Sequence, residues 1–173
     1  MALIKKVRGF EPQITKSSWL ADNATLIGDI TMGENCSFWF NAVVRGDVNS
    51  IVLGDNVNIQ DGAVIHCTYE KTKTILGNNV SVGHNALVHG CKVHDNVLIG
   101  MGAIVMDNCL IEENCIIAAG AVLLEGTHVK SGSIWAGVPA KKVKDLSPEK
   151  FKDEVMRIAQ NYRMYASWFE AEE

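Results

Sequence analysis

The amino-acid sequence predicts an all-β solenoid of hexapeptide repeats over residues 1–140, followed by a helix packed along it within residues 141–173. Three observations carry this prediction. Large apolar residues recur every six positions through most of the chain. All 15 glycines lie between Gly9 and Gly137. After Ala140 the composition becomes helix-like, with charged residues of both signs between apolar ones.

The six-residue period is clearest in the large residues that we expect to point inward. Glycine or another small turn residue often follows them directly. This period is too long for alternating β-structure and does not fit a 3.6-residue helix. It fits a solenoid of short strands and tight turns, with three hexapeptides in each coil of about 18 residues. The inward series is Leu26, Met32, Phe38, Val44, Leu53, Ile59, Ile65, Leu76, Val82, Val88, Val93, Ile99, Val105, Ile111, Ile117 and Leu123.

The tail has the start signals of a single amphipathic helix. Ser147 is a good N-cap, Pro148 suits the first helical position, and Leu146 with Phe151 forms a hydrophobic staple. Apolar residues then follow at helical spacing up to Phe169. We expect this helix to cover one side of the solenoid.

Composition excludes several classes of function. The 16 Lys and Arg against 20 Asp and Glu give a net charge of −4, which offers no field that attracts nucleic acid or anionic lipid. No apolar run approaches the ~20 residues that span a bilayer. The five cysteines form no Cys-x-x-Cys pair and the chain start lacks a secretory signal, so we expect a cytoplasmic protein.

Two histidines fall at the same position of consecutive coils. His66 and His89 each directly follow an inward residue, 23 positions apart. That separation equals one coil of about 18 residues plus a five-residue insertion, which we assign to a loop within residues 68–74. Arg45 falls in the same column one coil earlier. These three side chains are therefore predicted to stack on one face.

A second polar column lies on another face and contains Gln60, Asp61 and His84. One solenoid does not bring two faces to a single point. A cyclic homo-oligomer does, by opposing the first column of one subunit to the second column of its neighbour, and threefold closure is natural for a triangular prism.

Three imidazoles at one point are a poor structural device, because each must be desolvated and hydrogen-bonded. They are a good metal site, with an open fourth position for water. We therefore expect His66, His84 and His89 to bind one metal ion. His94 and His128 have no matching partners and are expected on the surface.

The residues around these histidines resemble those of the γ-class carbonic anhydrases, and the resemblance covers nearly the whole chain. Many acyltransferases share the hexapeptide period and the Gly-x-Pro-Ala-Lys motif, so the histidines with their Arg, Gln and Asp companions are the specific part. The matching segments are Arg45-Gly46-Asp47, Gln60-Asp61-Gly62, His66, Gly83-His84, His89-Gly90-Cys91, the run from Leu98 to Ala103, and the run from Trp135 to Lys141.

This resemblance implies a left-handed parallel β-helix and a homotrimer with a metal ion at each subunit interface. His66 and His89 would come from one subunit and His84 from the next. The implied metal is Zn2+, with Fe2+ under reducing conditions and Co2+ as a substitute.

The resemblance also implies the hydration of CO2 to bicarbonate by a metal-bound hydroxide. Gln60 would orient that hydroxide, while Arg45 would hold bicarbonate or pair with Asp61 across the interface. Asp47 would orient Arg45 or join the same network. Tyr162 would lie at the edge of the site if the terminal helix packs nearby.

The chain departs from the family pattern along the route by which protons leave. Val48 stands where the archaeal prototype has a glutamate directly after Arg-Gly-Asp, and the loop of residues 68–74 contains one acid, Glu70. Glu70 is thus the candidate for a proton route. Two alternatives stay open: a thioesterase or acyltransferase on the same scaffold, and a metal-binding trimer without hydrase activity.

Overall fold

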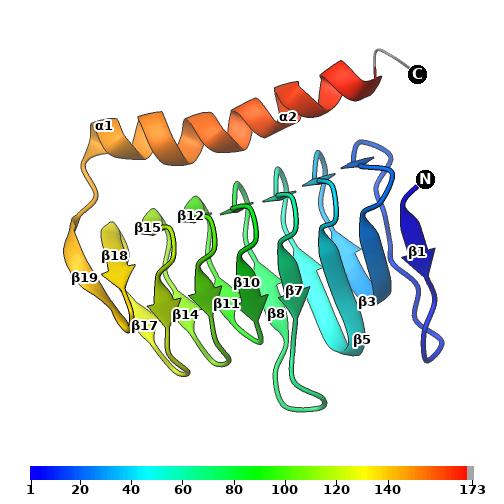
Figure 1. The fold of residues 1–173 in the computed structure, drawn as a ribbon, viewed down its shortest axis with the longest axis horizontal. Helices are drawn as coiled ribbons and strands as arrows, with labels where there is room; N and C mark the ends of the chain where they lie inside the picture. The colour runs from blue at the N-terminus through cyan, green and yellow to red at the C-terminus, as the bar shows by residue number, and fades with distance from the viewer. Residues whose placement is uncertain (171–173) are drawn as a thin grey trace.

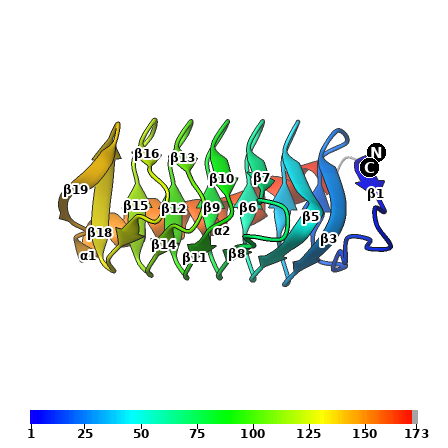
Figure 2. The same cartoon turned by 90° about the horizontal axis from the view of Figure 1, so that it is seen from below.

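The computed structural model describes residues 1–170 and shows a parallel β-solenoid of about seven coils with a helix along one side (Figure 1). The predicted parallel β-helix with its C-terminal helix is confirmed. Figure 2 shows the coils stacked one behind another along a single axis.

Three stacks of short parallel strands form the faces of the described solenoid. Two long strands, β3 (Thr25–Met32) and β5 (Val43–Leu53), bend around a corner and belong to the first and second faces. The rest of the first face is β1 (Leu3–Lys5), β7 (Val64–His66), β10 (Leu87–His89), β13 (Ile104–Val105) and β16 (Val122–Leu123). The rest of the second face is β8 (Thr74–Leu76), β11 (Lys92–Val93), β14 (Leu110–Ile111) and β17 (His128–Val129).

The third face carries the helix. Its strands are β2 (Trp19–Leu20), β4 (Ser37–Phe38), β6 (Asn58–Ile59), β9 (Ser81–Val82), β12 (Val97–Ile99), β15 (Cys115–Ile117) and β18 (Ser133–Gly137). The last strand, β19 (Ala140–Asp145), runs antiparallel to β18 and was not predicted. It spans the predicted division between residues 140 and 141, and that division stays a prediction.

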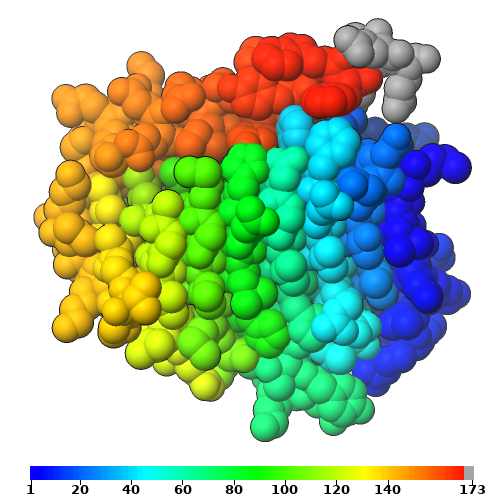
Figure 3. All heavy atoms as spheres, viewed as in Figure 1, coloured from blue at the N-terminus to red at the C-terminus, as the bar shows by residue number. Residues whose placement is uncertain are grey.

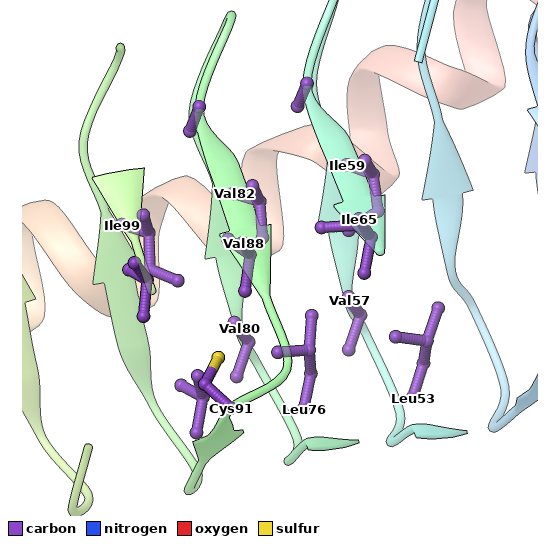
Figure 4. Packing of buried hydrophobic residues seen from close by; sticks show 14 of the residues in the cluster. Leu53, Val57, Ile59, Ile65, Leu76, Val80, Val82, Val88, Cys91 and Ile99 are labelled. Atoms are coloured by element: carbon purple, nitrogen blue, oxygen red, sulfur yellow. The ribbon is translucent and has the colours of Figure 1, made fainter. Parts of the chain in front are cut away.

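The core is the inward series itself, and every predicted member of that series is buried. Figure 4 shows how equivalent residues stack: Ile59 and Ile65 of one coil lie beside Val82 and Val88 of the next. Burying a side chain of this size contributes about 1.5–3 kcal/mol. Because each coil presents its apolar surface to two neighbours, the six-residue period fixes the register of the whole stack.

The corners are turned by residues in the left-handed backbone region, most of them Asn or Gly. Asparagines also stack at one corner of consecutive coils. The side-chain amide of Asn79 donates to Asn96 at 2.9 Å, and that of Asn96 donates to Asn114 at 3.1 Å. Asn tolerates positive φ because its short polar side chain hydrogen-bonds locally. These asparagines therefore serve both the turn and the contact between coils.

The glycines that directly follow inward residues do not supply the turn conformation that the sequence suggested. Neither Gly83 nor Gly100 has a positive φ. A Cβ at Gly83 would lie 2.7 Å from the backbone nitrogen of Met101, and one at Gly100 would lie 2.5 Å from that of Ala119. Stacking of the coils excludes a side chain at these positions, since backbone atoms of the next coil occupy the space.

The helix starts as the sequence predicts. The Ser147 hydroxyl accepts from the Lys150 backbone nitrogen at 3.2 Å, and Pro148 opens the first turn. Leu146 and Phe151 pack against the same buried cluster, which contains Ile134. The helix is less regular than predicted, because the π-helical segment η1 separates its two α-helical parts. These parts are α1 (Pro148–Lys150), η1 (Phe151–Met156) and α2 (Arg157–Glu170).

From the last coil, the helix runs back over the third face towards the chain start (Figures 1 and 3). Its far end rests on an aromatic cluster, where the ring centroids of Phe169 and Trp19 are 5.2 Å apart. Across residues 1–170, none of the helices has the length and apolar character that crossing a bilayer requires.

Asn96 tests the double role of the corner asparagines. We expect Asn96→Ala to lower the free energy of unfolding by about 2–3 kcal/mol, because it combines left-handed strain with the loss of two side-chain hydrogen bonds. Asn96→Gly loses the same hydrogen bonds without that strain, so its effect should be about 1 kcal/mol smaller. Urea unfolding at a fixed protein concentration measures both, and equal losses would contradict the assigned role of positive φ.

Candidate metal centre

Two histidines lie side by side on the first face. His66 ends β7 and His89 ends β10, and the register of these parallel strands pairs the two residues directly. Nδ1 of His66 lies 3.1 Å from Nε2 of His89. The spacing argument of one coil plus a five-residue insertion therefore placed this pair correctly.

Two carboxylates flank the pair. Asp47 lies 3.1 Å from Nε2 of His66, and Asp107 lies 3.0 Å from Nδ1 of His89. Each ring thus turns one nitrogen to a carboxylate and the other to the partner ring. Arg45 extends the series, since its guanidinium contacts the second oxygen of Asp47 at 2.6 Å.

Counting protons shows what this series needs. Ionised carboxylates only accept hydrogen bonds, so each ring must donate to its own carboxylate. The contact between the rings needs one proton more than two neutral imidazoles supply. A cation between Nδ1 of His66 and Nε2 of His89 is therefore required to satisfy every group, and either a shared proton or a metal ion meets that requirement.

The electrostatics favour ionised carboxylates and a neutral ring. Burial opposes ionisation of Asp47, but the His66 hydrogen bond and Arg45 outweigh it and lower its pKa. The pKa of Asp107 is lowered in the same way, by hydrogen bonds from Thr72 and His89 against burial. Burial and the charge of Arg45 lower the pKa of His66 despite its bond to Asp47. A neutral imidazole is the form that ligates metals.

The donor set fits a metal ion. Two nitrogens bound tetrahedrally to Zn2+ at about 2.0–2.1 Å lie roughly 3.3–3.4 Å apart. The observed 3.1 Å between His66 and His89 is close to that separation. Metal-ligating histidines also typically donate their other N–H to a carboxylate, which Asp47 and Asp107 accept here.

His84 lies apart from this pair, at the start of the turn after β9. Asp61 contacts its Nδ1 at 2.9 Å, and the Tyr162 hydroxyl of the helix contacts its Nε2 at 3.2 Å. Burial, followed by the charge of Asp61, raises the pKa of Tyr162 to about 12. The phenol is therefore protonated at neutral pH while it contacts His84.

Gln60 belongs to the His84 side of the molecule. It is buried, and its side-chain amide donates to Asn58 at 3.0 Å, while Asn58 donates to Ser81 at 2.7 Å. Within one chain, over residues 1–170, no three His, Cys, Asp or Glu side chains converge as a metal site. The structure thus shows the two separate columns that the sequence predicted. His66 and His89 lie in the first, and His84 lies in the second with Gln60 and Asp61.

Glu70 lies in the loop between β7 and β8, with a left-handed φ of 53°. It lines a small pocket of about 210 Å³ together with Arg8 and Asp47. In the part of the chain that the structure describes, no hydrogen bond joins Glu70 to a histidine. Its role as a proton route stays a prediction.

Sequence reasoning missed Asp107 and the loop that holds it. The hydroxyls of Thr72 and Thr68 donate to the Asp107 carboxylate at 2.8 and 3.2 Å. One signal was present, because Asp107 follows His89 by 18 positions, which is one coil. The loop of residues 68–74 therefore does more than interrupt the repeat: it orients the carboxylate that faces His89.

Comparison with known proteins agrees with the fold and the repeat pattern. The family model for the bacterial transferase hexapeptide (six repeats) matches residues 90–125, and that for the hexapeptide repeat of succinyl-transferase matches residues 29–67 and 73–106. A crystal structure of a Bacillus cereus protein provisionally named an acetyltransferase superposes with a TM-score of 0.95, at 35% identity over 99% of both chains.

Several curated relatives bear the carbonic anhydrase name. Gamma carbonic anhydrase 2 of Arabidopsis thaliana, a mitochondrial protein, is 37% identical over 89% of this chain but only 56% of its own length. This chain therefore spans little more than half of that relative. The carbonic anhydrase of Geobacillus kaustophilus is 37% identical over 98% of this chain and 92% of its own length. Because that identity extends over nearly all of both proteins, the chain belongs to the γ-carbonic anhydrase-like family of hexapeptide-repeat proteins.

Proposed function

We propose that this chain forms a homotrimer that hydrates CO2 to bicarbonate at metal sites between its subunits. His66 and His89 of one subunit and His84 of the next hold the ion. The observation that carries this proposal is shared by all three histidines: each pairs one ring nitrogen with a carboxylate, from Asp47, Asp107 or Asp61. That arrangement is typical of metal-ligating histidines.

Three neutral imidazoles suit Zn2+, and they also accept Fe2+ or Co2+. A bound ion of this kind supplies a water molecule that ionises near pH 7 and acts as the nucleophile. The chain supplies its surroundings: Asp47, Asp61 and Asp107 fix the ring orientations. Arg45 pairs with Asp47 through one guanidinium nitrogen, and because its side chain is 43% exposed, its other N–H groups can contact the bicarbonate anion.

Gln60 and Tyr162 belong to the subunit that contributes His84. Both line the same groove as His84, and the Tyr162 phenol already contacts the ring nitrogen opposite Asp61. When that nitrogen serves as a ligand, Tyr162 lies at the edge of the site. Gln60 offers an amide that orients a small polar substrate or water.

The first face supports the trimer. Its outward positions next to the histidine column are apolar in five successive coils, and none of them is fully buried. Such a stripe beside a polar site is typical of a protein interface. A second copy of the chain is the occupant that also completes the metal site. The stripe consists of Val43, Val64, Leu87, Ile104 and Val122.

The five cysteines are free and buried, which fits a reducing compartment such as the cytoplasm. Acyl transfer is the second candidate function, because the Bacillus cereus protein at 35% identity bears an acetyltransferase name. Turnover of acyl-CoA that survives removal of the metal would favour it over CO2 hydration.

Stopped-flow measurement of CO2 hydration tests the main proposal. Protein loaded anaerobically with Zn2+ or Fe2+ should hydrate CO2 at least about tenfold faster than metal-free protein, because the metal supplies the nucleophile. His84→Ala carried through the same loading serves as the control and should stay at the metal-free rate. A fully metal-loaded wild type with no excess rate would refute CO2 hydration.

Mixed trimers test whether the site is shared between subunits. His66→Ala and His84→Ala should each abolish tight zinc binding, because each removes a ligand from every site. A trimer containing both variants has one interface at which the intact His66 and His89 pair meets an intact His84. We expect two-tag purification and metal analysis to find about one zinc per mixed trimer. Zinc-free mixed trimers, or zinc-loaded parents, would contradict the shared site.

Asp107 is predicted to strengthen metal binding through His89. Asp107→Asn should weaken zinc affinity by about 10–100-fold, because the ring loses its carboxylate partner. Competition with a chromogenic chelator measures the affinity. Asp95→Asn is the matched control, since Asp95 also accepts at a corner, from the Asn78 backbone at 2.8 Å, but contacts no predicted ligand. Equal affinities in the two variants would show that Asp107 has no effect on the metal.

A further inference from the structure

A groove of about 540 Å³ lies between the C-terminal helix and the third face. One end is lined by Gln60, His84 and Tyr162, and the other by Lys144 and Lys150. Its volume falls within the range of small-molecule sites. The helix that Figure 3 shows along the coils forms its roof.

The helix packs on the third face on both sides of the groove. At one end the ring of Trp39 packs on Tyr162, with centroids 5.1 Å apart. At the other end Phe151 packs on the cluster that contains Ile134. Between them the outward positions that follow the inward residues are small, namely Gly83, Gly100 and Ala118.

The two glycines have no room for a side chain. The backbone of the next coil excludes a side chain at Gly83 and at Gly100. The space above the two glycines therefore stays open as long as the coils stack, while Val155 of the helix packs on Ile116 and Ile134 further towards the helix start. The groove is a consequence of the repeat geometry together with the two anchors of the helix.

The lining of the groove is apolar on the floor and cationic at one end. Leu98, Ile116 and Ile134 supply the apolar floor. Lys144, which lies in β19, and Arg157, which opens α2, both line the groove, and Glu154, the acid among the lining residues, is paired with Lys150 at 2.7 Å. The positive charges of Lys144 and Arg157 are therefore not neutralised by the groove itself.

The helix is irregular over this same stretch. The π-helical segment η1 (Phe151–Met156) ends directly before Arg157. Such segments occur frequently at functional sites. The irregular segment thus adjoins Arg157, one of the cations that line the groove.

We propose that this groove binds an apolar monocarboxylate of medium chain length. The carboxylate lies at Lys144 and Arg157, and the hydrocarbon chain extends over Leu98 and Ile116 towards His84. Apolar contact supplies the affinity and the two cations fix the direction in which the ligand lies. The site needs neither CO2 hydration nor the metal, so it goes beyond the proposed function.

Isothermal titration with octanoate tests the proposal, with 1-octanol as the uncharged analogue. We expect one saturable site per chain for octanoate, with at least tenfold weaker binding of 1-octanol. The whole chain of residues 1–173 is titrated both with and without Zn2+, and the affinity for octanoate should be the same. Failure of CO2 hydration would leave this result unaffected.

Charge reversal tests the assigned direction of the ligand. The double variant Lys144→Glu with Arg157→Glu should bind octanoate at least tenfold more weakly and 1-octanol unchanged. The matched control, Lys141→Glu with Arg163→Glu, makes the same change in net charge at positions outside the groove lining and should bind like the wild type.

A blocking variant tests the path of the chain. Ala118→Phe places a large side chain on the groove floor and should weaken octanoate and 1-octanol together. The charge variants keep the proposal testable if this substitution disturbs folding. The proposal is overturned if octanoate gives no saturable binding, or if the charge-reversed variant and its control bind it equally.

Discussion

The stacking of inward apolar residues is the interaction on which the rest of this structure depends. Parallel coils lie about 4.8 Å apart, so a residue in one coil lies almost directly over its equivalent in the next. Ile65 over Val88 is one such pair, and it places His66 over His89 immediately outside the core. The two proposed metal ligands, His66 and His89, thus owe their separation to the hydrophobic repeat.

The stacking of His66 on His89 has an electrostatic consequence. Stacking of His66 on His89 brings the two imidazoles within hydrogen-bonding distance. Because each ring donates its N–H to a flanking carboxylate, the two ring nitrogens that face each other need a cation between them. The same register that fills the core therefore creates a demand for positive charge on the surface. Asp107 takes part only because the inserted loop of residues 68–74 lends it two hydroxyl partners. The loop that interrupts the repeat thus supplies the hydrogen bonds that hold the carboxylate facing His89.

The third face both anchors the C-terminal helix and forms a groove with it. Its first coils carry aromatic residues that anchor the helix, and its middle coils carry Gly83 and Gly100, which leave a groove beneath it. Tyr162 lies where the two regions meet and reaches His84. The helix thus connects the edge of the proposed metal site with the proposed carboxylate site, although neither needs the other in order to bind its ligand.

The sequence by itself determined the features that repeat. The six-residue period identified the buried residues, the spacing of His66 and His89 placed them on consecutive coils, and Ser147 with Pro148 marked the start of the helix. Each of these rests on contacts between neighbouring repeats or within one helical turn, which a period or a capping motif records directly.

Tertiary structure decided the features that do not repeat. The partnership of His89 with Asp107, the contact of Tyr162 with His84, the antiparallel strand β19 and the groove beneath the helix all join segments that no period relates. Gly83 shows the distinction at a single residue. The sequence suggested that glycine is needed there for a turn, whereas the structure shows that the backbone of the next coil leaves no room for a side chain. Contacts of this kind depend on where a loop or helix packs, and that path is set by the whole folded surface.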